Sequence, residues 1–490
     1  MEKLFKENVY VFILLIFNFL YRLFIYYNTN LFDFADHSNH LAAMEAIKET
    51  GQFTLGHGGW LYLISYIGYF CKYNLGNFDY FFVLNSLLGT MSTFFIYIFI
   101  MRTINRRDVG LIYLISASLY SEYIALSSIF YTQVIETLIS SVLINLLLSL
   151  HRSKIVYRNI IIILSITILL LFSFFFKPTL RYFWVIIFSI SLFNIQNRQL
   201  ALKYFILAVT IISVNLSIKI FNPQFHSIIS GMDVKKSYSL IFWGHTLYGG
   251  DGGEATFIYA ENKQKYNINY NNWLNENNML GINNLNEDDF RKDEIKRFVT
   301  NHPLMWLKLQ IYKFSRTFGI VPEGQTFTIL YSGLFQYNWF ITALYLQIPF
   351  FSFIMLIIFL FDIKVVKKYC LNRFFFTWVI FFSYWITAIV FYQSFQERYR
   401  IPVMVIFLLP VFSLFISDFK IKNMFKGKIA ILKCIVLSVV LLSWVSQAYN
   451  VLVVRKERYF GFVNRVSQSD DPSSKIEYLW KKRYWMDDDK

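Results

Sequence analysis

Residues 78–107 read FDYFFVLNSLLGTMSTFFIYIFIMRTINRR, an apolar run of about 24 residues that ends in a basic cluster. A run of this length can cross the hydrocarbon core of a bilayer as one helix. Similar runs recur along most of the chain, and Lys and Arg collect in every second short connection between them. Because basic loops remain in the cytoplasm, the pattern predicts an all-α polytopic membrane protein and also its orientation.

The apolar runs predict about 11 transmembrane helices. They cover residues 9–27, 78–101, 108–128, 131–150, 157–175, 179–194, 200–220, 338–361, 374–393, 401–418 and 429–449. With the first span running outward, every basic cluster falls inside. The clusters contain Arg102, Arg106 and Arg107; Arg152, Lys154 and Arg158; Arg198 and Lys203; Lys364, Lys367, Lys368 and Arg373; and Lys420, Lys422, Lys426 and Lys428. The N-terminal run lacks a small-residue cleavage site, so we expect it to be retained as the first span.

This scheme divides the chain into four parts. Residues 1–221 form a seven-span catalytic module that includes a first outer loop at 28–77. Residues 222–337 form one large extracytoplasmic loop, 338–450 a four-span module, and 451–490 a polar tail. We expect a helix at 36–50, which Gly51 ends, and interfacial helices at 60–70 and at 303–318. Ala42, Ala43, Ala46 and Ile47 mark one side of the helix at 36–50.

Composition supports a membrane protein and excludes other classes. The chain is 56% hydrophobic and only 16% charged, and its net charge of +16 lies mainly in the inner loops. The charge therefore indicates orientation and attraction to anionic membrane lipids, and we expect no nucleic-acid partner. The three cysteines show neither disulfide nor metal spacing. No nucleotide-binding motif is present, so the substrate should come from the membrane itself. We expect a bacterial cytoplasmic membrane.

Acidic residues and histidines follow the first span. Asp33 and Asp36 are placed to act as a general base or as metal ligands, although an Asp at position 36 also suits a helix N-cap. Asp33, Asp36, His37 and His40 follow helical spacing and could bind a metal, but interfacial histidines are common.

Glu122 and Glu136 lie inside predicted spans, each about 9 Å below the outer surface at 1.5 Å per residue. Ionisable groups at such depth usually face a cavity or a partner. A structural hydrogen bond to a neighbouring Tyr, Ser or Gln is the alternative.

The short outer connections contain few basic residues, and these are Lys177 with Arg181 in one and Arg398 with Arg400 in another. Arginine is suited to phosphate oxygens, so these residues predict an anionic ligand. The alternative is an interfacial anchor with Glu397 as partner.

Five stretches together resemble the GT-C superfamily of polyprenyl-phosphate-sugar glycosyltransferases, in the branch of protein O-mannosyltransferases and lipid A aminoarabinose transferases. They are 36–51, 59–62 (GWLY), 120–136 (YSEYIALSSIFYTQVIE), 177–179 (KPT) and 397–402 (ERYRIP). The chain departs from that pattern at His40, where the family commonly has Tyr, and at Gly58-Gly59, where it has Pro-Pro.

The resemblance implies a sugar transferred with inversion from a polyprenyl phosphate to an acceptor hydroxyl on the extracytoplasmic face. It implies Asp36 as general base and Lys177, Arg398 and Arg400 as donor-phosphate ligands. The implied substrate pocket contains Asp33, His40, Glu122, Tyr131, Gln133, Glu136, Tyr399 and His245. Some members use a divalent metal, so Mg²⁺ or Mn²⁺ held by Asp33, Asp36 and Glu136 is an open expectation. The acceptor is a lipid, a glycan or a protein.

Two other functions fit the sequence less well. A polyprenyl-linked polysaccharide polymerase or ligase would not need the acidic first loop. A lipid-linked-sugar flippase or transporter would need polar residues across the midplane, whereas Glu122, Glu136, Lys177 and Arg398 cluster toward one face.

Overall fold

The computed structural model describes residues 2–28, 36–51, 62–128, 130, 132–174, 183–221 and 401–418, with isolated positions between 296 and 307 and at 438. All regular elements in these residues are helices. The helices described below belong to one compact unit, made of Met1–Gly231, Thr328–Tyr384 and Ile401–Leu452. The predicted loop 222–337, the spans at 338–361, 374–393 and 429–449, and the tail lie outside the described residues apart from those isolated positions.

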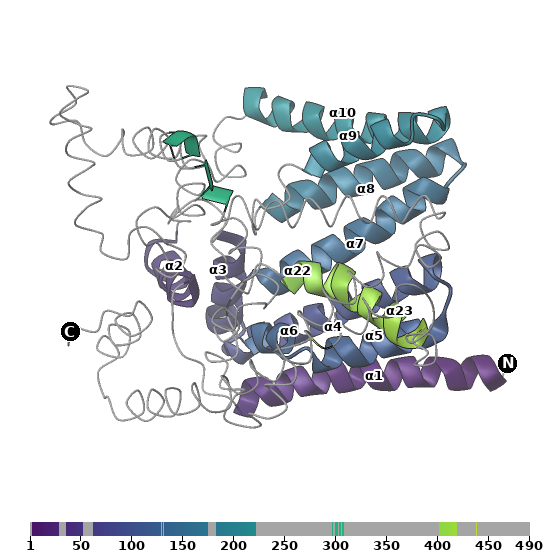
Figure 1. Cartoon of the computed structure of the whole chain (residues 1–490). Coiled ribbons are helices and arrows are strands. Elements are labelled where there is room, and N and C mark those ends of the chain that lie inside the picture. Colours follow the sequence, from purple (N-terminus) through teal and green to yellow (C-terminus); the bar gives the residue numbers. More distant parts are fainter. Residues whose placement is uncertain are drawn as a thin grey trace, which may run out of the picture. The chain divides into compact units, whose positions relative to one another are not determined.

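Five described helices are long and apolar enough to cross a membrane, which identifies the chain as an integral membrane protein. These are α1 (Glu2–Asn28), α4 (Asp79–Thr103), α7 (Gln133–Arg152), α8 (Val156–Phe174) and α10 (Arg198–Phe221). All five agree with predicted spans. Figure 1 shows them side by side, with α9 (Phe183–Phe193) between α8 and α10. The α9 helix is shorter than the predicted span 179–194, whose first residues are not described.

The predicted span 108–128 is wrong as a single helix. Helix α5 (Arg107–Leu119) stops at Tyr120, which has an extended backbone, with φ −74° and ψ 91°. A short helix α6 (Ser121–Ala125) and a 3-10 turn η2 (Leu126–Ser128) follow before α7 begins. We call residues 120–136 the broken segment. Its irregular backbone requires hydrogen-bond partners from neighbouring helices, because lipid offers none.

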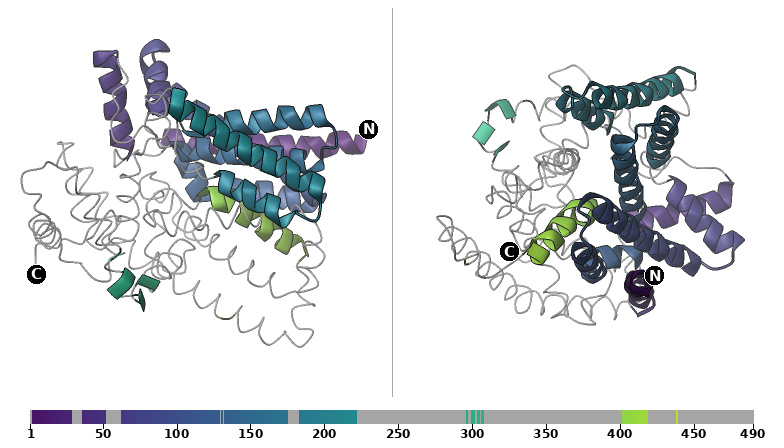
Figure 2. Two further views of the ribbon diagram at one scale, coloured as in Figure 1. Left: turned by 90° about the horizontal axis from the view of Figure 1, so that it is seen from above. Right: turned by 90° about the vertical axis from the view of Figure 1, so that its right-hand side faces the viewer.

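The two helices of the first loop lie at the end of the bundle opposite the N-terminus (Figures 1 and 2). These are α2 (Asp36–Thr50) and α3 (Tyr62–Tyr69), which continues as a π-helical turn η1 (Phe70–Asn74). We call this end of the bundle the α2 end. The predicted bounds of α2 are confirmed, and Gly51 ends it with φ +62°. Its buried residues are His40, Met44 and Ile47, and on the side marked in the sequence Ile47 is buried while Ala43 and Ala46 are half-buried.

The opposite end carries the basic clusters, and we call it the basic end. Arg152 donates a hydrogen bond to the carbonyl oxygen of Arg102 at 2.6 Å, and Lys203 donates to that of Ser153. Three clusters that are far apart in sequence therefore share one end of the bundle, as the positive-inside pattern predicts.

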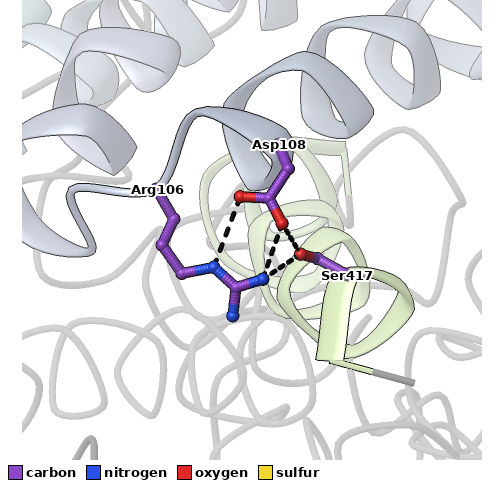
Figure 3. A network of polar contacts seen from close by, with 3 residues as sticks. All are labelled: Arg106, Asp108 and Ser417. Carbon is purple, nitrogen blue, oxygen red and sulfur yellow. Dashed lines mark hydrogen bonds and ion pairs between the residues drawn. The ribbon is translucent and has the colours of Figure 1, made fainter. Parts of the chain in front are cut away.

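The predicted span 401–418 also reaches the basic end. It comprises α22 (Ile401–Val403), a π turn η8 (Met404–Leu408) and α23 (Leu409–Asp418). Arg106 pairs with Asp108 at 2.6 Å, and both side chains bond the Ser417 hydroxyl (Figure 3). Because Arg106 and Asp108 flank the start of α5 and Ser417 lies at the end of α23, these two helices run antiparallel. Ile401 therefore lies toward the α2 end, where α22 contacts α7.

Candidate functional site

Every described side chain of the broken segment is buried in protein. Tyr120, Tyr123, Ser127 and Phe130 are all buried. The segment contains six hydroxyl-bearing or acidic side chains among its first nine residues, so its polarity is high for a position within a membrane bundle. Buried polar groups of this kind are costly unless they are hydrogen-bonded, and they usually mark function or a specific structural role.

Arg22 of α1 holds the broken segment from one side. It is the only charged residue in the span Val9–Tyr27, and it is completely buried. Its Nη1 donates to the carbonyl oxygen of Tyr123 at 3.1 Å and also to the Ser127 hydroxyl. Its Nε donates to Asn18 Oδ1 at 2.9 Å, while the guanidinium lies 4.2 Å from the centroid of the Tyr123 ring. The charge is thus stabilised by carbonyl dipoles and a π face.

Among the described residues no carboxylate pairs with Arg22, and its Nη2 has no hydrogen-bond partner. A buried arginine without an acidic partner is uncommon in a membrane span. Its bonds to main-chain and hydroxyl oxygens indicate that Arg22 shapes the backbone of the broken segment.

Helix α4 holds the same segment from the other side. Asn85 donates to the carbonyl oxygens of Leu126 at 3.3 Å and Ser127 at 3.1 Å, and the Tyr123 hydroxyl donates to the carbonyl oxygen of Gly89 at 3.0 Å. A Cβ on Gly89 would lie 2.5 Å from Nη1 of Arg22. Glycine at position 89 therefore makes room for the guanidinium, and the two helices together satisfy the carbonyl groups that the helix break frees.

Phe130 connects the broken segment to both first-loop helices. Its ring lies 5.4 Å from the His40 ring of α2, measured between centroids. A Cβ on Gly68 of α3 would lie only 2.4 Å from Cζ of Phe130. Phe130 also packs on Phe81 of α4, at a centroid distance of 4.5 Å. Two stretches that carry the family resemblance, 36–51 in α2 and the broken segment, therefore meet at one buried ring, against which Gly68 of α3 also packs.

A polar contact fixes α2 to η1 beside this cluster. Lys72 Nζ lies 2.7 Å from Glu45 Oε1, and the Tyr73 hydroxyl donates to Oε2 of the same carboxylate. The hydrogen bond from Lys72, followed by that from Tyr73, lowers the pKa of Glu45 below its ordinary value. The same pairing with Glu45 raises the pKa of Lys72. The contact thereby joins the two helical parts of the first loop at physiological pH.

Two of the predicted pocket residues lie in the first turn of α7. Gln133 and Glu136 are both buried, and Gln133 Oε1 has no hydrogen-bond partner among the described residues. Glu136 is the fourth residue of α7, so it lies at a helix start, where the helix dipole stabilises a negative charge. The predicted role of Glu136 in lining a pocket stays a prediction.

The structure brings some predicted site residues together and does not describe others. His40 packs against Phe130, and Gln133 and Glu136 follow Phe130 along the chain in the first turn of α7. Asp36 begins α2 one turn before His40, and Glu122 lies on α6, but their side chains lie outside the described part of the chain. So do the other predicted site residues, which are Asp33, Tyr131, Lys177, His245, Arg398, Tyr399 and Arg400.

The metal expectation stays a prediction. Among the described residues no three His, Cys, Asp or Glu side chains gather as a metal site. Of the candidate ligands, Asp33 and the Asp36 side chain are not described, so Mg²⁺ or Mn²⁺ remains to be tested by experiment.

Two residues at this site were not singled out from the sequence. A single arginine inside the first span is a signal that could have identified Arg22, because charges within spans are rare. Phe130 gives no such signal among 54 phenylalanines.

No family model matches this chain, and no curated protein matches it.

Proposed function

We propose that this chain is a GT-C-type membrane glycosyltransferase that moves a sugar from a polyprenyl phosphate to an acceptor hydroxyl. The proposal includes about 11 spans and an active site on the extracytoplasmic face, at the α2 end. The observation that carries it is the meeting of α2, α3 and the broken segment at Phe130. Residues 36–51 and 120–136 are two of the five stretches that resemble the family, and about ninety residues separate His40 from Phe130.

The reaction is a displacement at the anomeric carbon. The acceptor oxygen forms a bond to that carbon as the bond to the lipid phosphate oxygen breaks, and the configuration inverts. Asp36 accepts the proton of the acceptor hydroxyl, and the electron pair of the broken bond leaves with the phosphate. Fixed cations stabilise the charge that develops there, a role we assign to Lys177, Arg398 and Arg400. His40, Gln133 and Glu136 line the sugar or acceptor pocket.

Chain connectivity supports this assignment of the arginines. Arg400 directly precedes Ile401, the first residue of α22, and α22 contacts α7. Helix α7 begins with Gln133 and carries Glu136 in its first turn. The acidic start of α2 and the buried acid of α7 both belong to elements at the α2 end.

Mass spectrometry of polyprenyl-linked sugars and surface glycans tests the proposal in cells. Asp36→Asn should remove one sugar from the glycans and cause its lipid donor to accumulate. Glu49→Gln is the matched control, because Glu49 is an exposed acid on the same helix, and it should leave both pools unchanged. Unchanged pools in a normally expressed Asp36→Asn variant would exclude Asp36 as base. A polymerase or a transporter would then be favoured.

A further inference from the structure

Five basic side chains gather at the basic end of the bundle. They come from the end of α4, the end of α7, the following turn, the start of α8, and α10, and they are Arg102, Arg152, Lys154, Arg158 and Lys203. Some of them bind the ends of helices. Arg102 Nη2 donates to the Ser149 hydroxyl at 3.0 Å, and Arg152 donates to the carbonyl oxygen of Arg102 at 2.6 Å. These bonds offset the partial negative charge at helix C-termini.

No carboxylate balances the cluster within the described residues. Arg152 and Arg158 both repel Arg102 electrostatically, and none of the five forms an ion pair there. The nearby Arg106 behaves differently, because Asp108 neutralises it at 2.6 Å. Gathered like charges are unfavourable unless an anion binds among them.

Two of the five basic residues have no role in holding helix ends. Lys154 and Arg158 are exposed, and no described group accepts a hydrogen bond from either side chain. Their donors are therefore available to a ligand. An arginine guanidinium and a lysine ammonium on adjacent turns match the oxygens of a phosphate group.

An apolar stripe begins at the same turn and continues along α8. Tyr157, Ile161, Leu164 and Ile168 follow each other at helical spacing and are 46–73% exposed. In a membrane bundle such a stripe faces acyl chains, while an aromatic residue at its end lies at headgroup level. The basic cluster and the stripe thus present a polar and an apolar half to one amphipathic ligand.

We propose that the basic end holds an anionic phospholipid, with its phosphate at Arg102, Lys154 and Arg158 and an acyl chain along α8. Charge complementarity and the adjoining lipid-facing stripe specify the occupant, since a soluble phosphate would need no stripe. The site is at the opposite end of the bundle from the proposed active site and does not depend on it.

Native mass spectrometry of the purified full-length chain in detergent tests this site. Titration with phosphatidylglycerol should show one lipid bound in preference to phosphatidylcholine. The double variant Lys154→Gln, Arg158→Gln should bind phosphatidylglycerol about thirtyfold more weakly, as expected when two basic residues beside an anionic headgroup are lost. Lys154→Arg with Arg158→Lys keeps the charge and should retain most of the affinity.

Arg198→Gln is the matched control, because it removes one charge from the N-terminus of α10 at the same end of the bundle. It should leave the affinity unchanged. Equal binding of both lipids, an unaffected Lys154/Arg158 double variant, or equal weakening by Arg198→Gln would each overturn the proposal. Release of the lipid by inorganic phosphate at equal concentration would show a plain anion site and would overturn it as well.

Discussion

The guanidinium of Arg22 lies 4.2 Å from the centroid of the Tyr123 ring and donates a hydrogen bond to the carbonyl oxygen of the same residue at 3.1 Å. One buried charge in the first span thus contacts both the side chain and the backbone of α6. Since α6 lies within the broken segment, the first span determines the shape of a segment that follows it by about a hundred residues. This relationship predicts how the bundle responds to substitution.

Arg22→Met should destabilise the protein. It leaves the Tyr123 carbonyl oxygen buried without that donor, at a cost of about 1–3 kcal/mol. Arg22→Lys keeps the charge but lacks the planar fork, so it should restore only part of the stability. Thermal unfolding in detergent measures both. Leu20→Ala is the control, because Leu20 is exposed on the same helix. A melting temperature of Arg22→Met equal to that of the native chain would show that the network contributes no stability.

Gly89→Ala should be destabilising through Arg22. The added Cβ would lie 2.5 Å from Nη1 and 2.8 Å from Cζ of Arg22. Overpacking of this kind costs about 1–3 kcal/mol, because the hydrogen-bonded guanidinium cannot move away freely. The same substitution in an Arg22→Met background should cost less, with a coupling energy of at least about 0.5 kcal/mol. Additive effects in this double-mutant cycle would locate the clash elsewhere.

Local signals in the sequence were sufficient for some elements. Asp36 and Gly51 bound a polar helix whose predicted limits agree with the structure, because an acidic start and a glycine with positive φ act within one turn. The five long spans also follow from hydropathy and length alone. The burial of His40 did not follow, because it packs against Phe130, which lies far along the chain.

The break after Leu119 could not be predicted from hydropathy. Residues 108–128 are apolar enough to form one span, and nothing in that stretch stops a helix. The donors that stabilise the break, Arg22 and Asn85, lie 101 and about 40 residues away in sequence. The sequence was sufficient to choose candidate polar residues, because acidic and amide side chains collect near one predicted face of the membrane. The contact of His40 with Phe130 required the tertiary structure.

Gly68→Ala should disturb the cluster around Phe130. Its Cβ would lie 2.4 Å from Cζ of Phe130, so α3 or the ring must shift, and α2 with it. We expect a loss of about 1–3 kcal/mol in stability and lower sugar transfer in the glycan assay. Phe130→Leu removes the clashing ring atoms and should partly rescue Gly68→Ala, although it costs stability on its own. Failure of this rescue would indicate that Gly68 contacts something other than Phe130.

The Glu45–Lys72 contact predicts a pH dependence of the first loop. The folded pKa of Glu45 is lowered, so its contribution is complete above the unfolded value of about 4.5 and is lost as pH falls through the lower folded value. The raised pKa of Lys72 keeps its contribution complete below about 10.5. Because both side chains are about 40% exposed, the contact should be worth only about 0.2–1 kcal/mol.

The reaction rate of the buried Cys71 thiol in η1 measures how firmly this contact holds. Cys370→Ser and Cys434→Ser leave Cys71 as the one cysteine, and 2,2′-dithiodipyridine is used as the reagent because it reacts with thiols at both acidic and neutral pH. At pH 7, Cys71 should react about 1.5–5 times faster in the Glu45→Gln variant than in the protein with Glu45, in line with a weak surface ion pair. This ratio of rates should approach one as pH falls through the folded pKa of Glu45. For the Glu49→Gln control, the same ratio should be one at every pH. A ratio that does not change with pH would show that the pair does not hold η1 against α2.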